Sequence, residues 1–266
     1  METVGVMGLG TVGTAVAVVF EDSGVIVRGF DRYQQRGSVS DMSGCGAVFV
    51  CVPTPAGEQG YDVSEVWNAV DALAPHVAPG TVVAIKSTVP PGTADRLALA
   101  YPHVDVASVP EFLQAKRPSE TLRVPDRVII GSRSPAASAL LTRLMNLVAP
   151  AAPVVLVAPI EAELIKLCSN VLLAAKIAMA NELAAVCATF GAAWPRVQSG
   201  VGLDRRIGPD HLTVTGEGGF SGGCLPKDLD GLIGEARASG YRPRLLEEIA
   251  EFNRSVRRNL VSEGAS

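Results

Sequence analysis

Residues 218–228 contain a cysteine after a run of glycines, with a lysine and an aspartate within the next four positions. Glycines let the backbone approach a ligand closely, and Pro226 suits the first turn of a helix, so Cys224 is predicted just before a helix N-terminus. A helix N-terminus and the nearby Lys227 both stabilise a thiolate, the nucleophilic form of cysteine. Asp228 is suited to transfer protons or to orient a water. The pattern predicts nucleophilic catalysis by Cys224, and the competing interpretation is a glycine-rich loop with a buried structural cysteine.

A second chemical motif lies near the start of the chain, where a G-x-G-x-x-G turn joins a predicted strand to a predicted helix and an acidic residue ends the next strand. Such a turn brings a pyrophosphate to the helix N-terminus, and Asp31 would accept hydrogen bonds from ribose hydroxyls. The charge of Asp31 repels a 2′-phosphate and favours NAD over NADP, a preference that Arg32 and Arg36 weaken. The competing interpretation is a turn that binds no cofactor. The turn residues predicted to bind NAD are Gly8, Gly10, Thr11, Val12 and Gly13.

The elements that position these motifs alternate between strand and helix over residues 1–158, which predicts an NAD-binding, Rossmann-type α/β domain with a doubly wound, mostly parallel sheet. Ligands bind beyond the carboxyl ends of such strands, so the loops after four of them should line one crevice, to which Thr88 and Glu111 offer polar side chains. Those loops begin at Gly8, Pro53, Ser87 and Pro110. Strands are expected over residues 4–7, 25–30, 47–52, 81–85, 104–108, 128–130 and 154–157, and helices over 14–20, 63–73, 95–100 and 135–148.

From Pro159 the pattern becomes helical, and residues 159–266 are predicted to form a second, all-helical domain that carries the cysteine loop. Its longest helix is expected over residues 161–188, which contain neither glycine nor proline and are rich in alanine and leucine. Lys166 and Asn170 are four residues apart and therefore project from one face of that helix. Further helices are expected from Trp194 onward and over residues 226–239 and 243–261.

Composition excludes several other classes of protein. The chain has 266 residues and a net charge of −4, and it has no run of lysine or arginine to bind nucleic acid. Its first residues lack the basic segment of a signal peptide, and no 18-residue stretch is uniformly apolar, so no membrane association is expected. The five cysteines have neither metal-ligand nor disulfide spacing, which predicts no metal site and a reducing, cytoplasmic compartment.

Several ordered motifs resemble the UDP-glucose/GDP-mannose 6-dehydrogenase family, from the first glycine turn to about Val261. The resemblance implies a fold similar to that of 6-phosphogluconate dehydrogenase, with a helical domain that forms a homodimer on its long helix. It also implies NAD-dependent oxidation of a primary alcohol to a carboxylate, with two NAD used and no release of the aldehyde. The motifs are CVPTP at residues 51–55, STVP at 87–90, PEFL at 110–113, PDRVIIG at 125–131, ELIKLCSN at 163–170, NE at 181–182 and GGCLPKD at 222–228.

The resemblance assigns roles to the matching residues. Cys224 would attack the aldehyde to form a thiohemiacetal, which is oxidised to a thioester and then hydrolysed. Lys166 would stabilise the oxyanion with Asn170 beside it, Asp228 and Thr88 would hold the water, and Glu111 would assist as acid or base. The residues assigned to the cofactor beyond the glycine turn and Asp31 are Arg36, Val52, Pro53, Thr54, Ser87, Thr88 and Lys227. Those assigned to the substrate are Glu111, Phe112, Leu113, Lys166, Asn170, Phe220, Gly222, Gly223 and Arg206, the last reaching into the neighbouring chain.

The chain also departs from the family pattern. The family carries a third domain that binds the nucleotide of the substrate, whereas this chain is expected to be a short form that ends before it. Ser221 interrupts the glycine run that precedes the cysteine. These departures favour a smaller sugar or nucleoside substrate. Two alternatives stay open: a two-electron hydroxyacid dehydrogenase that needs no nucleophilic cysteine, and a non-catalytic scaffold that binds NAD.

Overall fold

The computed structural model describes residues 2–57, 60–114, 116–216 and 218–263, and the chain forms two compact units. The first unit comprises the chain up to Pro55 together with Tyr61–Lys166, and the second comprises Ala56–Gly60 and the chain from Leu167 onward. The compact units therefore divide later along the chain than the domain boundary predicted between residues 158 and 159, which stays a prediction. The start of the long helix belongs to the first unit because it packs closely there: a Cβ on Gly131 would lie 2.6 Å from the Cβ of Ala162.

The first unit is built on a seven-stranded sheet with the strand order β2-β1-β3-β6-β7-β8-β9. Neighbouring strands are parallel except β7 and β8, which are antiparallel. The prediction of a mostly parallel, doubly wound α/β sheet is confirmed. The strands are β1 (Thr3–Met7), β2 (Ile26–Phe30), β3 (Ala47–Val50), β6 (Val82–Ile85), β7 (Asp105–Ser108), β8 (Val128–Ser132) and β9 (Val154–Val157).

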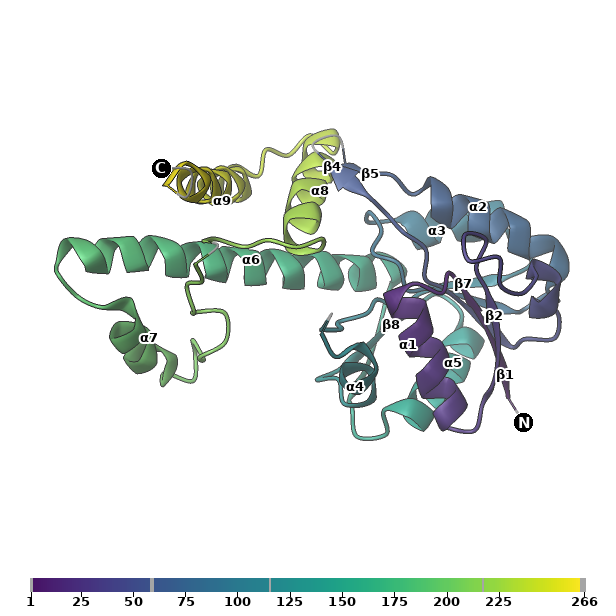
Figure 1. Ribbon diagram of the computed structural model, residues 1–266. Helices are drawn as coiled ribbons and strands as arrows, with labels where there is room; N and C mark the ends of the chain where they lie inside the picture. Colours follow the sequence, from purple (N-terminus) through teal and green to yellow (C-terminus); the bar gives the residue numbers. More distant parts are fainter. Residues whose placement is uncertain (1, 58–59, 115, 217, 264–266) are drawn as a thin grey trace. The chain divides into compact units, whose positions relative to one another are not determined.

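Helices cover both faces of this sheet because successive strand side chains point to opposite sides (Figure 1). One apolar core joins one side of the sheet to α1, α4 and α5, and a second joins the other side to α2 and α3. The helices are α1 (Thr11–Asp22), α2 (Ser64–Leu73), α3 (Thr93–Ala100), α4 (Pro118–Arg123) and α5 (Pro135–Val148), with 3-10 turns η1 (Val39–Met42) and η2 (Ala74–His76). The pattern missed α4, in which Leu122 is the buried residue. Helix α1 starts three residues before the prediction, directly after Gly10.

The second unit contains four helices within its described residues: α6 (Pro159–Thr189), which starts in the first unit, α7 (Trp194–Gly202), α8 (Leu225–Ala238) and α9 (Arg244–Glu263). One apolar core joins α6, α8 and α9 around Phe220, and a smaller one surrounds Trp194. The short strands β4 (Ala56–Gly57) and β5 (Gly60–Tyr61), which the pattern missed, pair with each other, and β4 packs against α8. The prediction of a helical second part is confirmed.

Candidate functional site

The glycine turn between β1 and α1 depends on two of its glycines for its shape. Gly8 has a φ of 87°, and a Cβ there would lie 2.6 Å from the carbonyl oxygen of Cys51. A Cβ on Gly13 would lie 1.7 Å from the carbonyl oxygen of Gly8. A Cβ on Gly10 would instead meet no described atom within 4 Å, although Gly10 caps the N-terminus of α1. The turn thus leaves open space at a helix N-terminus, which is where a pyrophosphate would bind.

Asp31 is held rigidly at the end of β2 and is only 8% exposed. One carboxylate oxygen accepts the N–H of Leu9 at 2.7 Å, and the other accepts the N–H groups of Tyr33 and Gln34, both at 2.9 Å. Burial raises the pKa of Asp31, but these three N–H donors outweigh burial and the pKa lies below its ordinary value. The side chain is therefore a fixed anion beside the glycine turn.

A cavity of about 360 Å³ joins the glycine turn to Asp31. Four of the predicted cofactor residues besides Asp31 line it: Gly8, Gly10, Val52 and Pro53. Arg36 is not among the described residues that line the cavity, and its backbone pairs with that of Asp31. The open helix N-terminus and the fixed acid fit the phosphates and a ribose of NAD. Arg32, which was expected near a 2′-phosphate, also lines the cavity. The remaining lining residues, which the sequence pattern did not assign to the cofactor, are Met7, Phe30, Tyr33, Gln34, Val39, Cys51, Glu65, Ala69 and Ala72.

The predicted hydroxyl residues after β3 and β6 brace the loops on the rim of the sheet. The hydroxyl of Thr54 donates to the carbonyl oxygen of Thr88 at 2.6 Å, and that of Ser87 donates to the carbonyl oxygen of Val52 at 2.7 Å. These bonds link the two strand exits directly. The hydroxyl groups of Thr54 and Ser87 thus hold the two loops together. Their predicted contact with NAD stays a prediction.

Lys166 and Glu111 come together within the first unit, as their strand-exit and helix positions allow. The ammonium nitrogen of Lys166 lies 3.3 Å from Glu111 Oε1, and Lys166 is only 5% exposed. Glu111 Oε2 also accepts the N–H of Leu113 at 2.5 Å. The ring of Phe112 has the Lys166 nitrogen 5.4 Å from its centroid and the Arg127 guanidinium carbon 4.3 Å from it. The buried ammonium group therefore has an anion and a ring face as partners.

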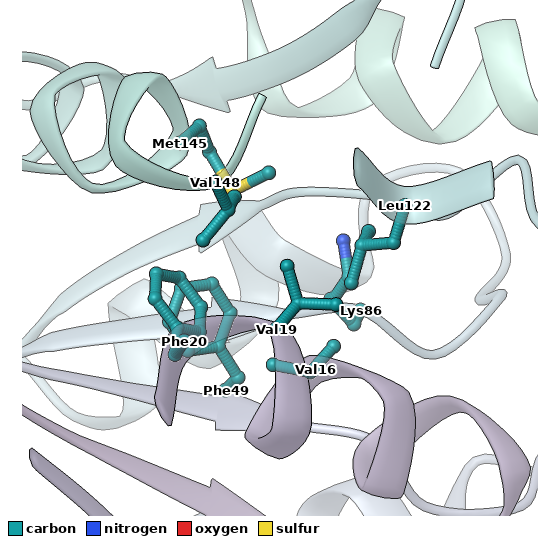
Figure 2. A pocket seen from close by; sticks show the side chains of 8 residues that line it. All are labelled: Val16, Val19, Phe20, Phe49, Lys86, Leu122, Met145 and Val148. Atoms are coloured by element: carbon teal, nitrogen blue, oxygen red, sulfur yellow. The ribbon is translucent and has the colours of Figure 1, made fainter. Parts of the chain in front are cut away.

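A second buried lysine, Lys86, directly follows β6. Figure 2 shows its side chain among apolar residues that include Val16, Leu122 and Met145. Lys86 is 3% exposed and donates to the carbonyl oxygen of Val109 at 3.2 Å. Burial lowers the pKa of Lys86. The sequence analysis missed it, although a lysine directly after the buried VVAI strand was a usable signal.

The second unit places three of the predicted catalytic residues, Cys224, Asp228 and Asn170, around the start of α8. Asp228 is 1% exposed; its Oδ2 accepts the side-chain N–H of Asn170 at 2.6 Å, and its Oδ1 lies 2.7 Å from the Lys227 nitrogen. Cys224 is the N-cap residue of α8, as predicted, and it is exposed. The competing interpretation of a buried structural cysteine is therefore wrong.

The glycine loop before Cys224 is fixed by two asparagines. Asn253 on α9 accepts the N–H of Phe220 at 2.7 Å and donates to its carbonyl oxygen at 3.0 Å, while Asn181 on α6 accepts the N–H of Gly219 at 3.0 Å. Gly222 has a φ of 85°. The Phe220 side chain is buried in the core that joins α6, α8 and α9, and its predicted contact with substrate stays a prediction.

Two residues predicted from the family pattern lie outside these clusters. Arg206 follows α7, and its guanidinium forms an ion pair with Asp204, with Nη2 at 2.6 Å from Oδ2. Its predicted reach into a neighbouring chain stays a prediction. Thr88 contributes its backbone carbonyl to the bond with Thr54, and its predicted water-binding role is likewise untested.

A Rossmann-type sheet with this glycine turn, followed by helices that present Lys166, Asn170 and Cys224, defines a dinucleotide-binding protein with a fold like that of 6-phosphogluconate dehydrogenase. Residues 32–148 match the NAD binding domain of the UDP-glucose/GDP-mannose dehydrogenase family, and residues 160–255 match the central domain of the same family. The chain belongs to the UDP-glucose/GDP-mannose dehydrogenase family.

Known relatives agree with this family. A UDP-glucose 6-dehydrogenase of Rickettsia prowazekii is 35% identical over 227 residues, which are 83% of this chain and 52% of the relative. The structure of a UDP-glucose dehydrogenase from Pyrobaculum islandicum superposes with a TM-score of 0.87 at 29% identity, covering 96% of this chain and 68% of that one. A 3-hydroxyisobutyrate dehydrogenase of Mycobacterium tuberculosis shares the fold, with a TM-score of 0.75 at 16% identity over 94% and 92% of the two chains. The chain spans about half the length of the curated relatives it matches.

Proposed function

We propose that this protein oxidises a primary alcohol of a sugar or nucleoside substrate to a carboxylate, with NAD as the acceptor and Cys224 as the covalent nucleophile. The observation that carries the proposal is the start of α8, where an exposed cysteine caps the helix and a buried aspartate lies one turn later. The family membership and the cavity at the glycine turn support the cofactor. When bound, NAD would supply the hydride acceptor for each of the two oxidation steps.

The residues assigned to catalysis suit thioester chemistry. The thiolate adds to the aldehyde carbon, and a C–S bond forms as the carbonyl oxygen becomes an oxyanion. Lys166 is suited to stabilise that oxyanion because its ammonium group is buried and held by Glu111. Loss of a hydride from the same carbon leaves a thioester.

Hydrolysis then needs a water and a proton acceptor. Asp228 is suited to this step because Asn170 and Lys227 hold its two oxygens in a fixed orientation. Water adds to the thioester carbon and gives up a proton, the C–S bond breaks, and the Cys224 thiolate leaves. The first product is the carboxylic acid, which then loses a second proton to solvent and becomes the carboxylate.

The test is NADH production by wild type and Cys224→Ser on UDP-glucose, GDP-mannose, nucleosides and sugar phosphates. Wild type should form two NADH per carboxylate, and Cys224→Ser should lose about a thousandfold or more in carboxylate formation while a carbonyl-trapping reagent detects aldehyde. Cys168→Ser is the matched control, because Cys168 is also exposed but lies on α6. Unchanged carboxylate formation by Cys224→Ser would contradict the covalent mechanism.

Two other functions give different outcomes in the same assay. A hydroxyacid dehydrogenase would form one NADH per substrate and tolerate Cys224→Ser. This alternative is considered because the 3-hydroxyisobutyrate dehydrogenase of Mycobacterium tuberculosis shares the fold. A scaffold would bind NAD and form no NADH on any substrate. The exposed thiol at the N-cap of α8 favours the covalent dehydrogenase over both.

We also propose that the protein is a homodimer. Helix α6 carries an exposed apolar stripe at helical spacing, consisting of Leu164, Leu172, Met179, Leu183 and Val186. Among the described residues α6 is also the helix whose length and composition would allow it to span a membrane, and 22% of its most apolar window is buried. Pairing with a second copy would shield this apolar stripe from water.

Light scattering should give the mass of a dimer for wild type and of a monomer for a Leu172→Glu/Met179→Glu variant. Leu99→Glu is the control, because Leu99 on α3 is 83% exposed and lies outside α6. A monomeric wild type would contradict the dimer. We also propose a reducing, cytoplasmic compartment, because the five scattered cysteines do not have the spacing of a disulfide framework.

A further inference from the structure

Two carboxylates and one arginine are among the residues that line the cavity beside the glycine turn: Asp31, Glu65 and Arg32. Asp31 directly follows β2, whereas Glu65 lies in the first turn of α2 and comes from a distant part of the sequence. Both side chains line the same cavity, so a cofactor bound there would meet charges from two separate elements. The sequence analysis weighed only Asp31 and the arginines that follow it.

Arg32 is turned toward Glu65 in this structure. Its Nη2 lies 2.5 Å from Glu65 Oε1 and donates to the hydroxyl of Tyr33 at 2.7 Å. The guanidinium carbon also lies 4.7 Å from the centroid of the Tyr33 ring. The side chain of Arg32 is 48% exposed and that of Glu65 is 22% exposed. A carboxylate, a hydroxyl and a ring face therefore hold the cation.

An arginine directly after the ribose-binding acid is well placed to bind the 2′-phosphate of NADP. The neighbouring carboxylate of Glu65 opposes this in two ways: it occupies the guanidinium group, and it repels a phosphate dianion in the same cavity. An exposed ion pair is weak by itself, so neither contribution alone would dominate. Together they act in the same direction as the charge of Asp31.

We propose that Glu65 is a specificity-determining residue, which selects NAD over NADP by engaging Arg32 and withholding it from a 2′-phosphate. The selection then depends on two acids on two elements, with Asp31 facing the ribose hydroxyls and Glu65 restraining the cation. The inference rests on the cofactor part of the proposed function and is independent of the oxidation that follows.

Fragment binding tests the inference without turnover. Isothermal calorimetry on the full chain would measure the dissociation constants of ADP and of 2′,5′-ADP, which differ by the 2′-phosphate. Wild type should prefer ADP. Glu65→Gln should shift the ratio of the two constants toward 2′,5′-ADP by about three- to tenfold, with little change for ADP itself.

Asp71→Asn is the matched control, since it makes the same acid-to-amide change on α2 at an exposed residue that is not among the described residues lining the cavity. It should leave the ratio unchanged. A Glu65→Gln/Arg32→Met double variant should lose the gain, because the gain requires the released guanidinium group.

If Glu65→Gln has the same ratio of dissociation constants for ADP and 2′,5′-ADP as wild type, the inference is overturned. The cofactor site itself is still supported in that case, provided that wild type binds ADP. A gain that persists in the double variant, or that appears equally in Asp71→Asn, would also overturn it, because the effect would then be general charge repulsion. Absence of ADP binding by wild type would overturn both the cofactor site and the inference. Circular dichroism of each variant confirms that it is folded.

Discussion

Burial and hydrogen bonding shift the pKa of the Glu163 carboxyl group in opposite directions. The larger of the two effects decides whether the free energy of unfolding falls or rises with pH. The side chain is 2% exposed on α6. Its carboxylate oxygens accept the N–H of Gly92 at 2.5 Å and the N–H of Ala94 at 2.8 Å, so it caps the N-terminus of α3 from a distant part of the sequence. Burial favours the neutral acid, whereas the two N–H groups favour the carboxylate.

Burial prevails and raises the pKa of Glu163 to about 7 from 4.5, despite the N–H groups of Ala94 and Gly92. Below pH 4.5 the acid is protonated in both states and contributes no pH dependence. Between pH 4.5 and 7 the unfolded state releases a proton that the folded state keeps, so the free energy of unfolding falls as pH rises. The span of about 2.5 pH units corresponds to a loss of about 3 kcal/mol, complete above pH 7.

The assay is urea unfolding of wild type and Glu163→Gln between pH 4.5 and 8.5. Trp67 on α2 reports on the first unit if Trp194 is replaced by phenylalanine in both proteins. Subtracting the free energy of the variant from that of wild type removes the contribution of all other titrating groups. The difference should decline by about 1.4 kcal/mol per pH unit up to about pH 7 and then level off.

The reasoning is refuted if the difference is flat or rises with pH. A rise would mean that the two N–H groups and the helix N-terminus outweigh burial, so that the folded state binds the carboxylate in preference to the acid.

Three further predictions concern residues whose surroundings are equally well defined. Gly13→Ala should destabilise the protein by about 1–3 kcal/mol in urea unfolding and abolish NAD binding in a calorimetric titration, because its Cβ would lie 1.7 Å from the Gly8 oxygen. Gly10→Ala should keep wild-type stability and weaken only NAD binding, since its Cβ would meet no described protein atom within 4 Å; equal destabilisation by the two variants would contradict this difference. The free energy of unfolding of Lys86→Met relative to that of wild type should be highest at low pH and should fall as pH rises. Burial lowers the pKa of Lys86, so wild type gains stability as the lysine deprotonates. A difference between Lys86→Met and wild type that grows with pH would refute the burial argument.

Much of the architecture could be predicted from the sequence because it depends on local patterns. Short apolar runs such as residues 47–50 and 82–85 are buried on both faces of a parallel sheet, and they were recognised as strands. Helix α5 and strand β9 were predicted with the bounds that the structure shows. Element ends were less accurate: α1 begins at Thr11, because the glycine turn itself supplies the first helical residues.

Short elements without periodicity were missed. Helix α4 has six residues, and the strands β4 and β5 have two each, which is too few for a repeating pattern. Segment 56–60 belongs to the second unit although the sequence around it belongs to the first. No local signal marks such an assignment, because it depends on the packing of β4 against α8.

The sequence by itself determined the family, the glycine turn with its acid, and a cysteine at a helix N-terminus. These features consist of residues close together in the chain, whose backbone geometry and residue type restrict one another directly. Only the tertiary structure decided that Glu65 holds Arg32, that Lys166 meets Glu111 and that Glu163 caps α3. Each of these contacts joins residues from separate elements, and burial and hydrogen bonding between them arise only when the elements pack.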